Sequence, residues 1–203
     1  MNHKHISYLI LIEHVFSALM QTADVIFVID ASASIKASNF VKMQNFVSTL
    51  VMSMQVGSNS VRVGVMTFST TPSVIFHLDQ YYDPNVMVTE IMAAPYTSLN
   101  TYTGLAMEAV RTSMLPRARN NVQKLVILLA DGLSADRMLL YSEADSMKAD
   151  GVEIACIGIN IYDDDEFMTI SSNPDSSYFF KVSSFTLLND LAGNIVNEIC
   201  AGK

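Results

Sequence analysis

Three short apolar runs constrain the fold of this chain more than any other feature. They lie within the stretches DVIFVID (24–30), KLVILLAD (124–131) and VEIACIGI (152–159), and longer amphipathic stretches separate them. An unbroken apolar run of this length is typical of a strand that is buried on both faces. Strands of this kind that alternate with helices predict a mostly parallel sheet with helices on both sides.

The rest of the chain completes this pattern. Strands are also predicted at 61–69, 73–78 and 177–182, and the TTP between the first two favours a hairpin, which makes one strand antiparallel. Amphipathic spacing predicts helices at 38–54, 85–94, 103–115, 135–150, 164–171 and 184–200. We therefore expect a doubly wound, Rossmann-like α/β domain over residues 24–200. Its sheet has six mostly parallel strands, one antiparallel edge strand and helices on both faces.

Three helix boundaries carry local signals. Ser38 is expected to cap the helix at 38–54, because its hydroxyl can accept a hydrogen bond from an unpaired backbone N–H. Pro116 is expected to stop the helix at 103–115. Gly151 is expected to end the helix before it, because glycine readily adopts the left-handed backbone found after helices.

Composition narrows the class of protein. Half of the 203 residues are hydrophobic, which is enough for one well-buried core and excludes a disordered chain. The net charge of −8 argues against a nucleic-acid partner, since phosphate backbones are bound by clustered Lys and Arg. Two cysteines are too few for a disulfide scaffold. Cys156 lies in an apolar run and is expected to be a buried thiol, whereas Cys200 can be free or paired with another chain or domain.

Residues 1–23 form a separate segment with a weakly basic start, an apolar stretch and small residues near its end. This order is typical of a secretory signal peptide, although Glu13 and His14 interrupt the apolar part and no A-x-A site follows. The stretch is too short for a membrane span, so no membrane insertion of the domain is expected. We expect a secreted, extracellular protein; an unstructured leader on a cytoplasmic protein is the alternative.

Polar residues gather where the predicted strands end. Asp30, Ser32 and Ser34 follow the first strand, and Asp131 follows the run at 124–130. Thr101 precedes the helix at 103–115. Ligands of doubly wound sheets bind beyond the carboxyl ends of the strands, so these side chains are candidate site residues.

The chemistry of these side chains favours a cation. All are hard oxygen donors, the type that Mg²⁺ and Mn²⁺ prefer. Two aspartates brought together without a cation repel each other, which raises one pKa, and a divalent ion removes that penalty. A single D-x-S-x-S can also be a simple turn with local backbone hydrogen bonds, and only Thr101 and Asp131 in register favour the metal.

Five stretches in order resemble the von Willebrand factor type A family, which includes the integrin I domains. They are DASAS at 30–34, VRVGVMTFS at 61–69, TYTGLAM at 101–107, VILLADGLS at 126–134 and GVEIACIGI at 151–159. The resemblance covers residues 24–200. It implies a metal-ion-dependent adhesion site made of Asp30, Ser32, Ser34, Thr101 and Asp131, with Mg²⁺, Mn²⁺ or Ca²⁺ as the ion.

The same resemblance implies how a partner binds. The ion has an open coordination position that accepts a carboxylate from an acidic residue of a protein partner, and the loops around Ser32, Thr101 and Asp131 form the binding surface. Thr103 is expected to bond locally or to cap the following helix. In several members the final helix moves when the metal site rearranges, which makes the helix at 184–200, with Leu187, Leu191, Ile195 and Ile199 on one face, a candidate switch.

Two residues depart from the family pattern. Ala33 stands where glycine is common between the two serines, which fits only if its φ is negative. Ala130 stands where threonine is usual before the aspartate, at the cost of one supporting hydrogen bond. All five ligand types are still present, so we expect a competent site.

Other polar and sulfur-containing residues receive structural interpretations. The acidic run Asp163–Glu166 is expected to open a helix, where negative charge is favourable. His77, the only histidine outside the leader, is expected to be an ordinary strand side chain. The methionines in the first half of the domain are expected to fill the core; they are Met43, Met52, Met54 and Met66.

An enzyme is not expected. The sequence has no nucleophile elbow, P-loop, dinucleotide fingerprint or zinc spacing, and no histidine is placed to act as a base for Ser32 or Ser34. The leading hypothesis is an extracellular adhesion or matrix-binding module whose partner is a matrix protein or receptor. An intracellular scaffold and a structural domain with a vestigial metal site are the alternatives, and the domain can be one part of a larger multidomain chain.

Overall fold

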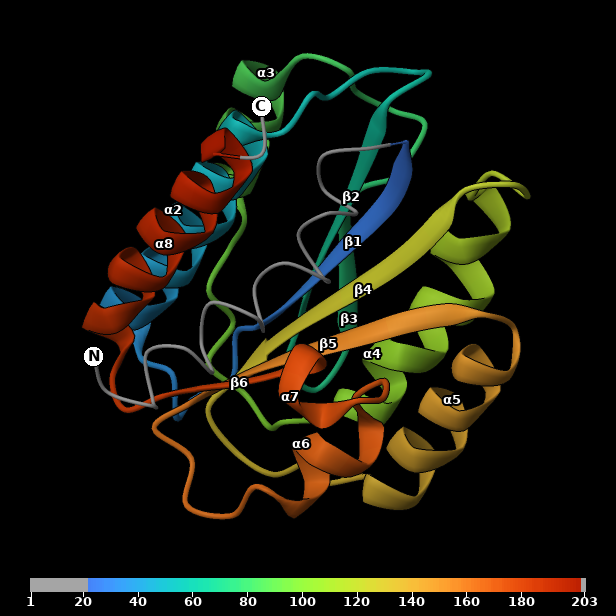
Figure 1. Cartoon of the computed structure of the whole chain (residues 1–203). Helices are drawn as coiled ribbons and strands as arrows, with labels where there is room; N and C mark the ends of the chain where they lie inside the picture. Colours follow the sequence, from blue (N-terminus) through green and yellow to red (C-terminus); the bar gives the residue numbers. More distant parts are fainter. Residues whose placement is uncertain (1–21, 202–203) are drawn as a thin grey trace.

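A six-stranded sheet runs through the centre of the computed structural model, which describes the backbone of residues 22–201 and the side chains of 22–175 and 177–196 (Figure 1). The strands lie in the order β3-β2-β1-β4-β5-β6. They are β1 (Ala23–Asp30), β2 (Val61–Phe68), β3 (Pro72–Phe76), β4 (Gln123–Ala130), β5 (Val152–Ile159) and β6 (Phe179–Val182). Every neighbouring pair is parallel except β2 and β3, which form the antiparallel edge. The predicted sheet is confirmed.

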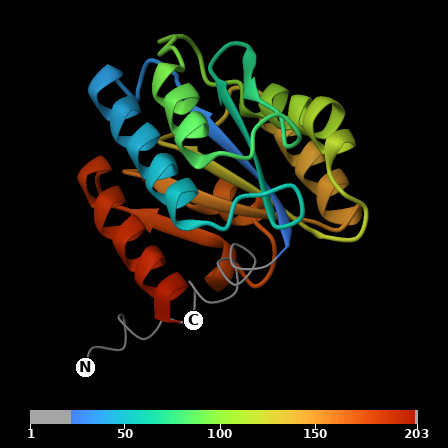
Figure 2. The same ribbon diagram turned by 90° about the horizontal axis from the view of Figure 1, so that it is seen from above.

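Helices cover both faces of this sheet. They are α2 (Ala37–Ser53), α3 (Pro84–Ala93), α4 (Thr103–Ala109), α5 (Arg137–Ala149), α6 (Asp165–Ile170), α7 (Asp175–Tyr178) and α8 (Leu188–Ala201). Figure 2 shows α2, α3 and α8 on one side of the sheet and α4 and α5 on the other. None of the helices within residues 22–201 is long and apolar enough to cross a membrane.

Each face of the sheet has its own hydrophobic core. Alternate residues of β1 point to opposite faces, so Val25, Phe27 and Ile29 pack under α2 and α8 while Ile26 and Val28 pack under α4 and α5. The other parallel strands alternate in the same way. Burial on both faces explains why these strands read as unbroken apolar runs.

The connections reverse direction between β1 and β4. From β1 the chain moves to β2 and β3 on one side, and then returns to place β4 on the other side of β1. Ile29 pairs with Leu129, so Asp30 and Asp131 come at the ends of neighbouring strands. This is the topological switch point, where loops diverge and leave room for a ligand.

Some predicted helix boundaries are wrong. Ser38 does not cap the first helix: α2 begins at Ala37 after Lys36, whose φ of 65° turns the chain and whose carbonyl accepts the first helical bonds. Pro116 does not stop the third helix at 115. Instead α4 continues through a π turn (Val110–Met114) and a 3-10 turn (Leu115–Arg117), in which Pro116 stands near the start, where a missing N–H is tolerated. Gly151 does end α5, with a φ of 76°.

The C-terminal part of the fold also differs in detail. The predicted strand 177–182 begins only at Phe179, because residues 175–178 form the short helix α7. The final helix begins with a 3-10 turn (Phe185–Leu187), and Leu188 rather than the exposed Leu187 packs into the core with Leu191 and Ile195.

Three further expectations concern single side chains or the chain ends. Met43, Met54 and Met66 are buried as predicted, but Met52 is 53% exposed on α2, so it is not a core residue. The predicted leader lies outside the described residues except for its last two, of which Ala23 already belongs to β1. The side chain of Cys200 also lies outside the described part.

Candidate metal centre

The first component of the site is the buried carboxylate of Asp30. Asp30 is the last residue of β1 and is 0% exposed. Its Oδ1 accepts a 2.7 Å hydrogen bond from the backbone N–H of Ser32, which turns the chain out of the strand. Its Oδ2 has no hydrogen-bond partner. A buried carboxylate oxygen without a partner is costly, so this atom marks a position suited to a cation.

Hydroxyls connect Asp30 to the end of β4. The Ser32 and Ser34 hydroxyl oxygens lie 3.1 Å apart, and the Ser34 hydroxyl donates a 2.7 Å hydrogen bond to Oδ1 of Asp131. Ser32 is buried and Ser34 is exposed, so the row of oxygens leads from the interior to the surface. Four of the five predicted site residues are thus brought together.

Without a cation, the charged forms of both carboxylates are disfavoured. Burial raises the pKa of Asp30 to about 7, and the nearby negative charge of Asp131 adds to the increase. Burial also raises the pKa of Asp131, although the Ser34 hydroxyl partly offsets it. A divalent cation between them would remove this cost. The donor set, two carboxylates and neutral hydroxyls, fits Mg²⁺ or Mn²⁺.

Thr101, the fifth predicted residue, lies on the loop before α4. Its carbonyl accepts a 2.8 Å hydrogen bond from the N–H of Ala135, which joins this loop to the one that carries Asp131. Two further backbone bonds join it to the β1–α2 loop: Ser98 N–H to the Ala31 carbonyl and Ala33 N–H to the Leu99 carbonyl, both 2.9 Å. The three predicted loops therefore meet in one place, and the Thr101 side chain is half-buried among them.

Residues that the sequence analysis did not select hold these loops. The Tyr96 hydroxyl donates to the carbonyl of Ser32 (3.1 Å). The Thr97 hydroxyl oxygen lies within hydrogen-bond distance of the Ala31 carbonyl (3.3 Å) and of the Ser69 hydroxyl (2.8 Å). These side chains come from loops without a recognisable motif. Their only sequence signal is a position near predicted strand ends.

Asp136 is another residue that was missed, and it corrects the expectation for Thr103. Thr103 is the buried first residue of α4, and no side chain of that helix caps its own N-terminus. Instead the Asp136 carboxylate accepts hydrogen bonds from Gly104 N–H (2.8 Å) and Leu105 N–H (2.9 Å). The Ser134 hydroxyl donates to the same carboxylate (2.5 Å), so it braces this link.

The two departures from the family pattern fit the loop. Ala33 is not among the described residues with positive φ, so alanine is tolerated there. The left-handed position in this turn is Lys36. Ala130 is buried at the end of β4.

Other candidates lie elsewhere or have structural partners. Cys156 is a fully buried core thiol, as predicted. The acidic run does open a helix: Asp163 accepts from the N–H of Asp165 at the start of α6, and Asp165 and Glu166 lie in its first turn. Glu166 is also buried and accepts from Ser134 N–H and Arg137. His77 follows the end of β3 and is not in a strand. Among the described residues, no three His, Cys, Asp or Glu side chains are grouped to hold a metal ion, so the candidate centre depends on its hydroxyls.

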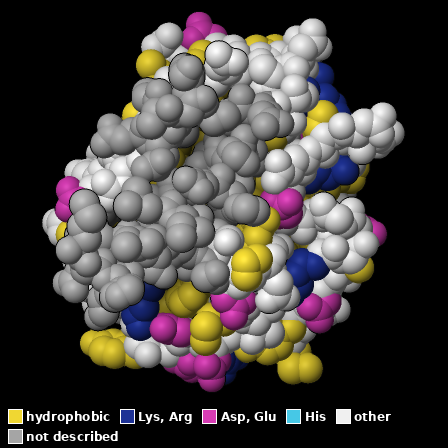
Figure 3. Space-filling model, viewed as in Figure 1, with side chains coloured by type: hydrophobic (Ala, Val, Ile, Leu, Met, Phe, Trp, Pro, Cys, Tyr) yellow, Lys and Arg dark blue, Asp and Glu magenta, His cyan; other side chains and the backbone are white. Residues whose placement is uncertain are grey.

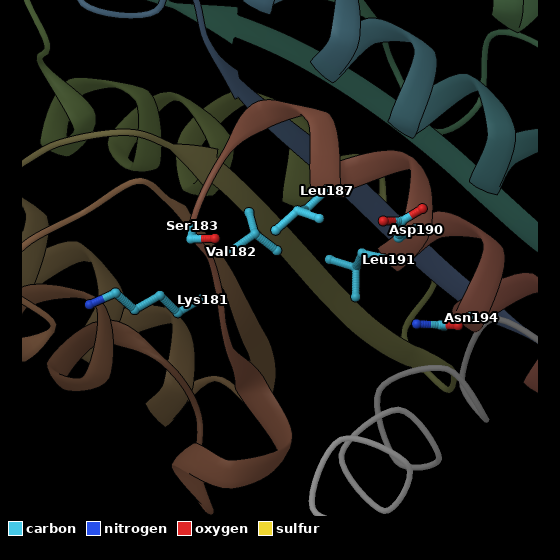
Figure 4. Close-up of a pocket in the computed structure, with 7 residues that line it drawn as sticks. All are labelled: Lys181, Val182, Ser183, Leu187, Asp190, Leu191 and Asn194. Carbon is cyan, nitrogen blue, oxygen red and sulfur yellow. The ribbon is translucent and has the colours of Figure 1, made fainter. Parts of the chain in front are cut away.

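A cavity of about 420 Å³ lies away from these loops, between the end of β6 and the start of α8 (Figure 4). Val182 on one side and Leu187 and Leu191 on the other point towards each other across it, and Asp190 and Asn194 line its outer part. None of the predicted metal-site residues lines this cavity.

Comparisons with known proteins agree with the fold. The family model described as "von Willebrand factor type A domain" matches residues 24–194. The collagen alpha-4(VI) chain of Mus musculus is 33% identical over 88% of this chain and 8% of its own length. Matrilin-3 of Gallus gallus is 28% identical over 89% of this chain and 41% of its own length. The chain therefore spans less than half of these relatives.

Solved structures of proximal thread matrix protein 1 from the mussel byssus are similar throughout the domain. One has a TM-score of 0.80 and 28% identity, and covers 90% of this chain and 47% of the mussel chain. A second, with a TM-score of 0.80 and 29% identity, covers 90% of this chain and 46% of that one, and is described as having a zinc-occupied MIDAS motif.

Proposed function

Because this chain belongs to the von Willebrand factor type A family, we propose that it is an adhesion or matrix-binding module that binds an acidic residue of a protein partner through a divalent cation. Asp30, Ser32, Ser34, Thr101 and Asp131 would hold that cation. The observation that carries the proposal is the buried, unpartnered Oδ2 of Asp30 at the switch point of the sheet.

Each residue has a distinct part in this proposal. Asp30 contributes negative charge from the interior, and Asp131 contributes it from the neighbouring strand end. Ser32, Ser34 and Thr101 contribute neutral oxygens. When bound, a divalent cation supplies an electropositive coordination position that a carboxylate can occupy. Because three of the five groups are uncharged, the site does not add more negative charge than the ion can balance, and a partner's carboxylate can still be attracted.

The ion is proposed to be Mg²⁺ or Mn²⁺, since hydroxyls and carboxylates are their preferred protein donors. Zn²⁺ deserves a direct comparison, because a similar mussel structure is described with zinc at the corresponding motif. The absence of thiolate and imidazole among the five groups favours the harder ions here.

An extracellular location is part of the proposal. Its support is the signal-like segment at 1–23 together with similarity to collagens and matrilins. The small share of these relatives that the chain spans supports a place within a larger assembly of domains.

Binding rather than catalysis is proposed as the activity. His77, the one histidine among the described residues, follows the antiparallel strand β3 and so lies towards the edge of the sheet opposite to the site. No imidazole base is therefore near the serines within the described part of the chain.

The test is cation binding followed by partner binding. Titration of the purified chain with Mn²⁺, read by the electron paramagnetic resonance signal of free Mn²⁺, should show one site that Asp30→Ala removes. Solid-phase binding to a panel of purified collagens and matrilins should then require Mg²⁺ or Mn²⁺ and stop in EDTA.

The outcomes separate the alternatives. Binding that persists both in EDTA and in Asp30→Ala would overturn the metal-dependent contact and leave a module that uses another surface. A chain that takes up no Mn²⁺, Mg²⁺ or Zn²⁺ would have a vestigial site.

A further inference from the structure

We propose that Asp136 is the positioning residue of the metal centre: it fixes the segment that carries Thr101 against the loop that carries Asp131, and so sets cation affinity without touching the ion. This inference rests on the proposed function. It assigns a role to a residue that lies outside the D-x-S-x-S and T-x-T-G stretches.

Asp136 belongs to the β4–α5 loop, directly before α5, but it caps a different helix, α4. Its two carboxylate oxygens each accept one backbone N–H of the first turn of α4, from Gly104 at 2.8 Å and from Leu105 at 2.9 Å. The neighbouring Ala135 N–H donates to the Thr101 carbonyl at 2.8 Å. Three hydrogen bonds thus join the β4–α5 loop to the segment from Thr101 to Leu105. On the β4–α5 side, they all come from two neighbouring residues, Ala135 and Asp136.

Further hydrogen bonds hold the β4–α5 loop in place. The Ser134 hydroxyl donates to Asp136, and the Ser134 N–H donates to the buried carboxylate of Glu166 at 2.8 Å. Glu166 is in turn paired with Arg137 at 2.7 Å. A shift of Asp136 relative to Ser134 or to α6 would have to break these contacts.

Gly104 makes the close approach possible. A Cβ at this position would lie 2.8 Å from a carboxylate oxygen of Asp136 and 2.7 Å from the backbone nitrogen of Leu140. Any larger residue would push α4 and α5 apart at the point where Thr101 meets the loop of Asp131. The glycine of the T-x-T-G stretch is therefore required by the contact with Asp136.

The consequence concerns ligand geometry. The other end of the Thr101 loop is fixed to the β1–α2 loop through Ser98 and Leu99. With Asp136 in place, Thr101 is held from both sides. Without its carboxylate, α4 loses its cap and Thr101 is held from one side only, so the oxygens around the ion are less well preorganised. Loss of a residue that supports a metal ligand typically reduces metal affinity by about 10–100-fold.

The experiment compares Asp136→Ala with Asp83→Ala, which is a matched control. Asp83 also caps a helix, by accepting from Asn85 N–H at 2.9 Å at the start of α3, but it makes no contact with the site loops in the described structure. Both variants lose a helix cap, and Asp136→Ala should lose more thermal stability in EDTA, because its carboxylate accepts two N–H bonds and the Ser134 hydroxyl. Only Asp136→Ala should lower Mn²⁺ affinity, by about 10–100-fold, in the paramagnetic resonance titration.

Asp136→Asn provides a second, milder variant in case the alanine variant does not fold. Its amide can accept from only one of the two N–H groups, so an intermediate loss of affinity is expected. Equal Mn²⁺ affinity of folded Asp136→Asn and wild type would overturn the inference while leaving the proposed function intact. Failure of the wild-type chain to bind any cation would overturn both.

Discussion

The Ser34 hydroxyl donates a 2.7 Å hydrogen bond to the carboxylate of Asp131, a residue 97 positions further along the chain. This contact joins the turn after β1 to the end of β4, and Asp30, whose Oδ2 has no partner, is the last residue of β1. In Figure 1 the two strands lie side by side in the middle of the sheet. The Ser34 hydroxyl and the Asp131 carboxylate are both predicted ligands of the cation. Removing the Ser34 hydroxyl alone therefore tests this contact.

Ser34→Ala should weaken cation binding without unfolding the domain. It removes one neutral donor and the hydrogen bond that orients Asp131, so Mn²⁺ affinity should fall by at least tenfold. Ser146→Ala is the matched control, because Ser146 is exposed on α5 and its hydroxyl donates to the carbonyl of Ser142 in the same helix. Isothermal titration with Mn²⁺ measures both, and a loss of affinity in Ser146→Ala of the same size would contradict the assignment.

Mg²⁺ should stabilise the folded chain. A ligand present at about 100 times its dissociation constant contributes about 2.7 kcal/mol, which corresponds to an increase in Tm of about 5–10 °C for a domain of this size. In Asp30→Asn the buried unpaired charge is gone. The Tm of this variant in EDTA should therefore equal or exceed that of wild type, and Mg²⁺ should no longer raise it. Differential scanning calorimetry measures both Tm values. If Mg²⁺ raised the Tm of Asp30→Asn as much as that of the wild type, Asp30 would not be a ligand of the cation.

Cys156 should be unreactive in the native chain. Burial raises the pKa of its thiol to about 12, so almost no thiolate exists at pH 8, and the side chain is fully enclosed. In a Cys200→Ser background, a thiol reagent such as DTNB should react only at the rate of unfolding. Raising the pH from 7 to 9 should change that rate little while the domain remains folded. Rapid labelling under native conditions would show that Cys156 is accessible.

Arg119→Ala should destabilise the fold strongly. Arg119 pairs with the buried carboxylate of Asp24 at 2.7 Å and donates to the carbonyls of Ala23 and Ser60, at the amino end of the sheet. Removal of the side chain leaves the buried Asp24 without its charged partner, although the backbone N–H of residue 119 still donates to it, and about 3–5 kcal/mol is typical for such a loss.

Arg117→Ala is the control for that variant. Arg117 also pairs with an aspartate, Asp79, but both side chains are more than 40% exposed. Its loss should change the free energy of unfolding by about 1 kcal/mol or less. Urea unfolding measures the two variants side by side, and equal effects would show that burial of Asp24 does not matter.

The positions of the central strands, and the polar residues at their ends, could be predicted from the sequence. A strand that is buried on both faces is an unbroken apolar run, which is easy to recognise. Asp30 and Asp131 could be selected for the same reason: each ends such a run. Helix starts were less predictable. Ser38 has the right chemistry for a cap, but the buried Ile35 and the left-handed Lys36 decide where α2 begins.

The side chains that hold the site loops together could not be predicted. Asp136 has no periodic or motif signal, and its role depends on α4 and α5 packing closely enough for Gly104 to meet it. Glu166 looked like one more acid at a helix start, although it reaches back to the β4–α5 loop. Such partners are set by three-dimensional packing, not by local sequence.

Acidic side chains are more frequent than basic ones on part of the surface. Figure 3 shows acidic and hydrophobic side chains interspersed along its lower edge, with few basic ones.

The spread of the candidate ligands along the chain has a consequence for folding. Asp30 and Asp131 are separated by 101 positions, and they approach each other only when β4 has added to β1 across the middle of the sheet. Closing so long a loop is slow compared with forming local structure. No short fragment of the chain can therefore reproduce the site, and uptake of Mn²⁺ during refolding would report the moment at which the two halves of the sheet join.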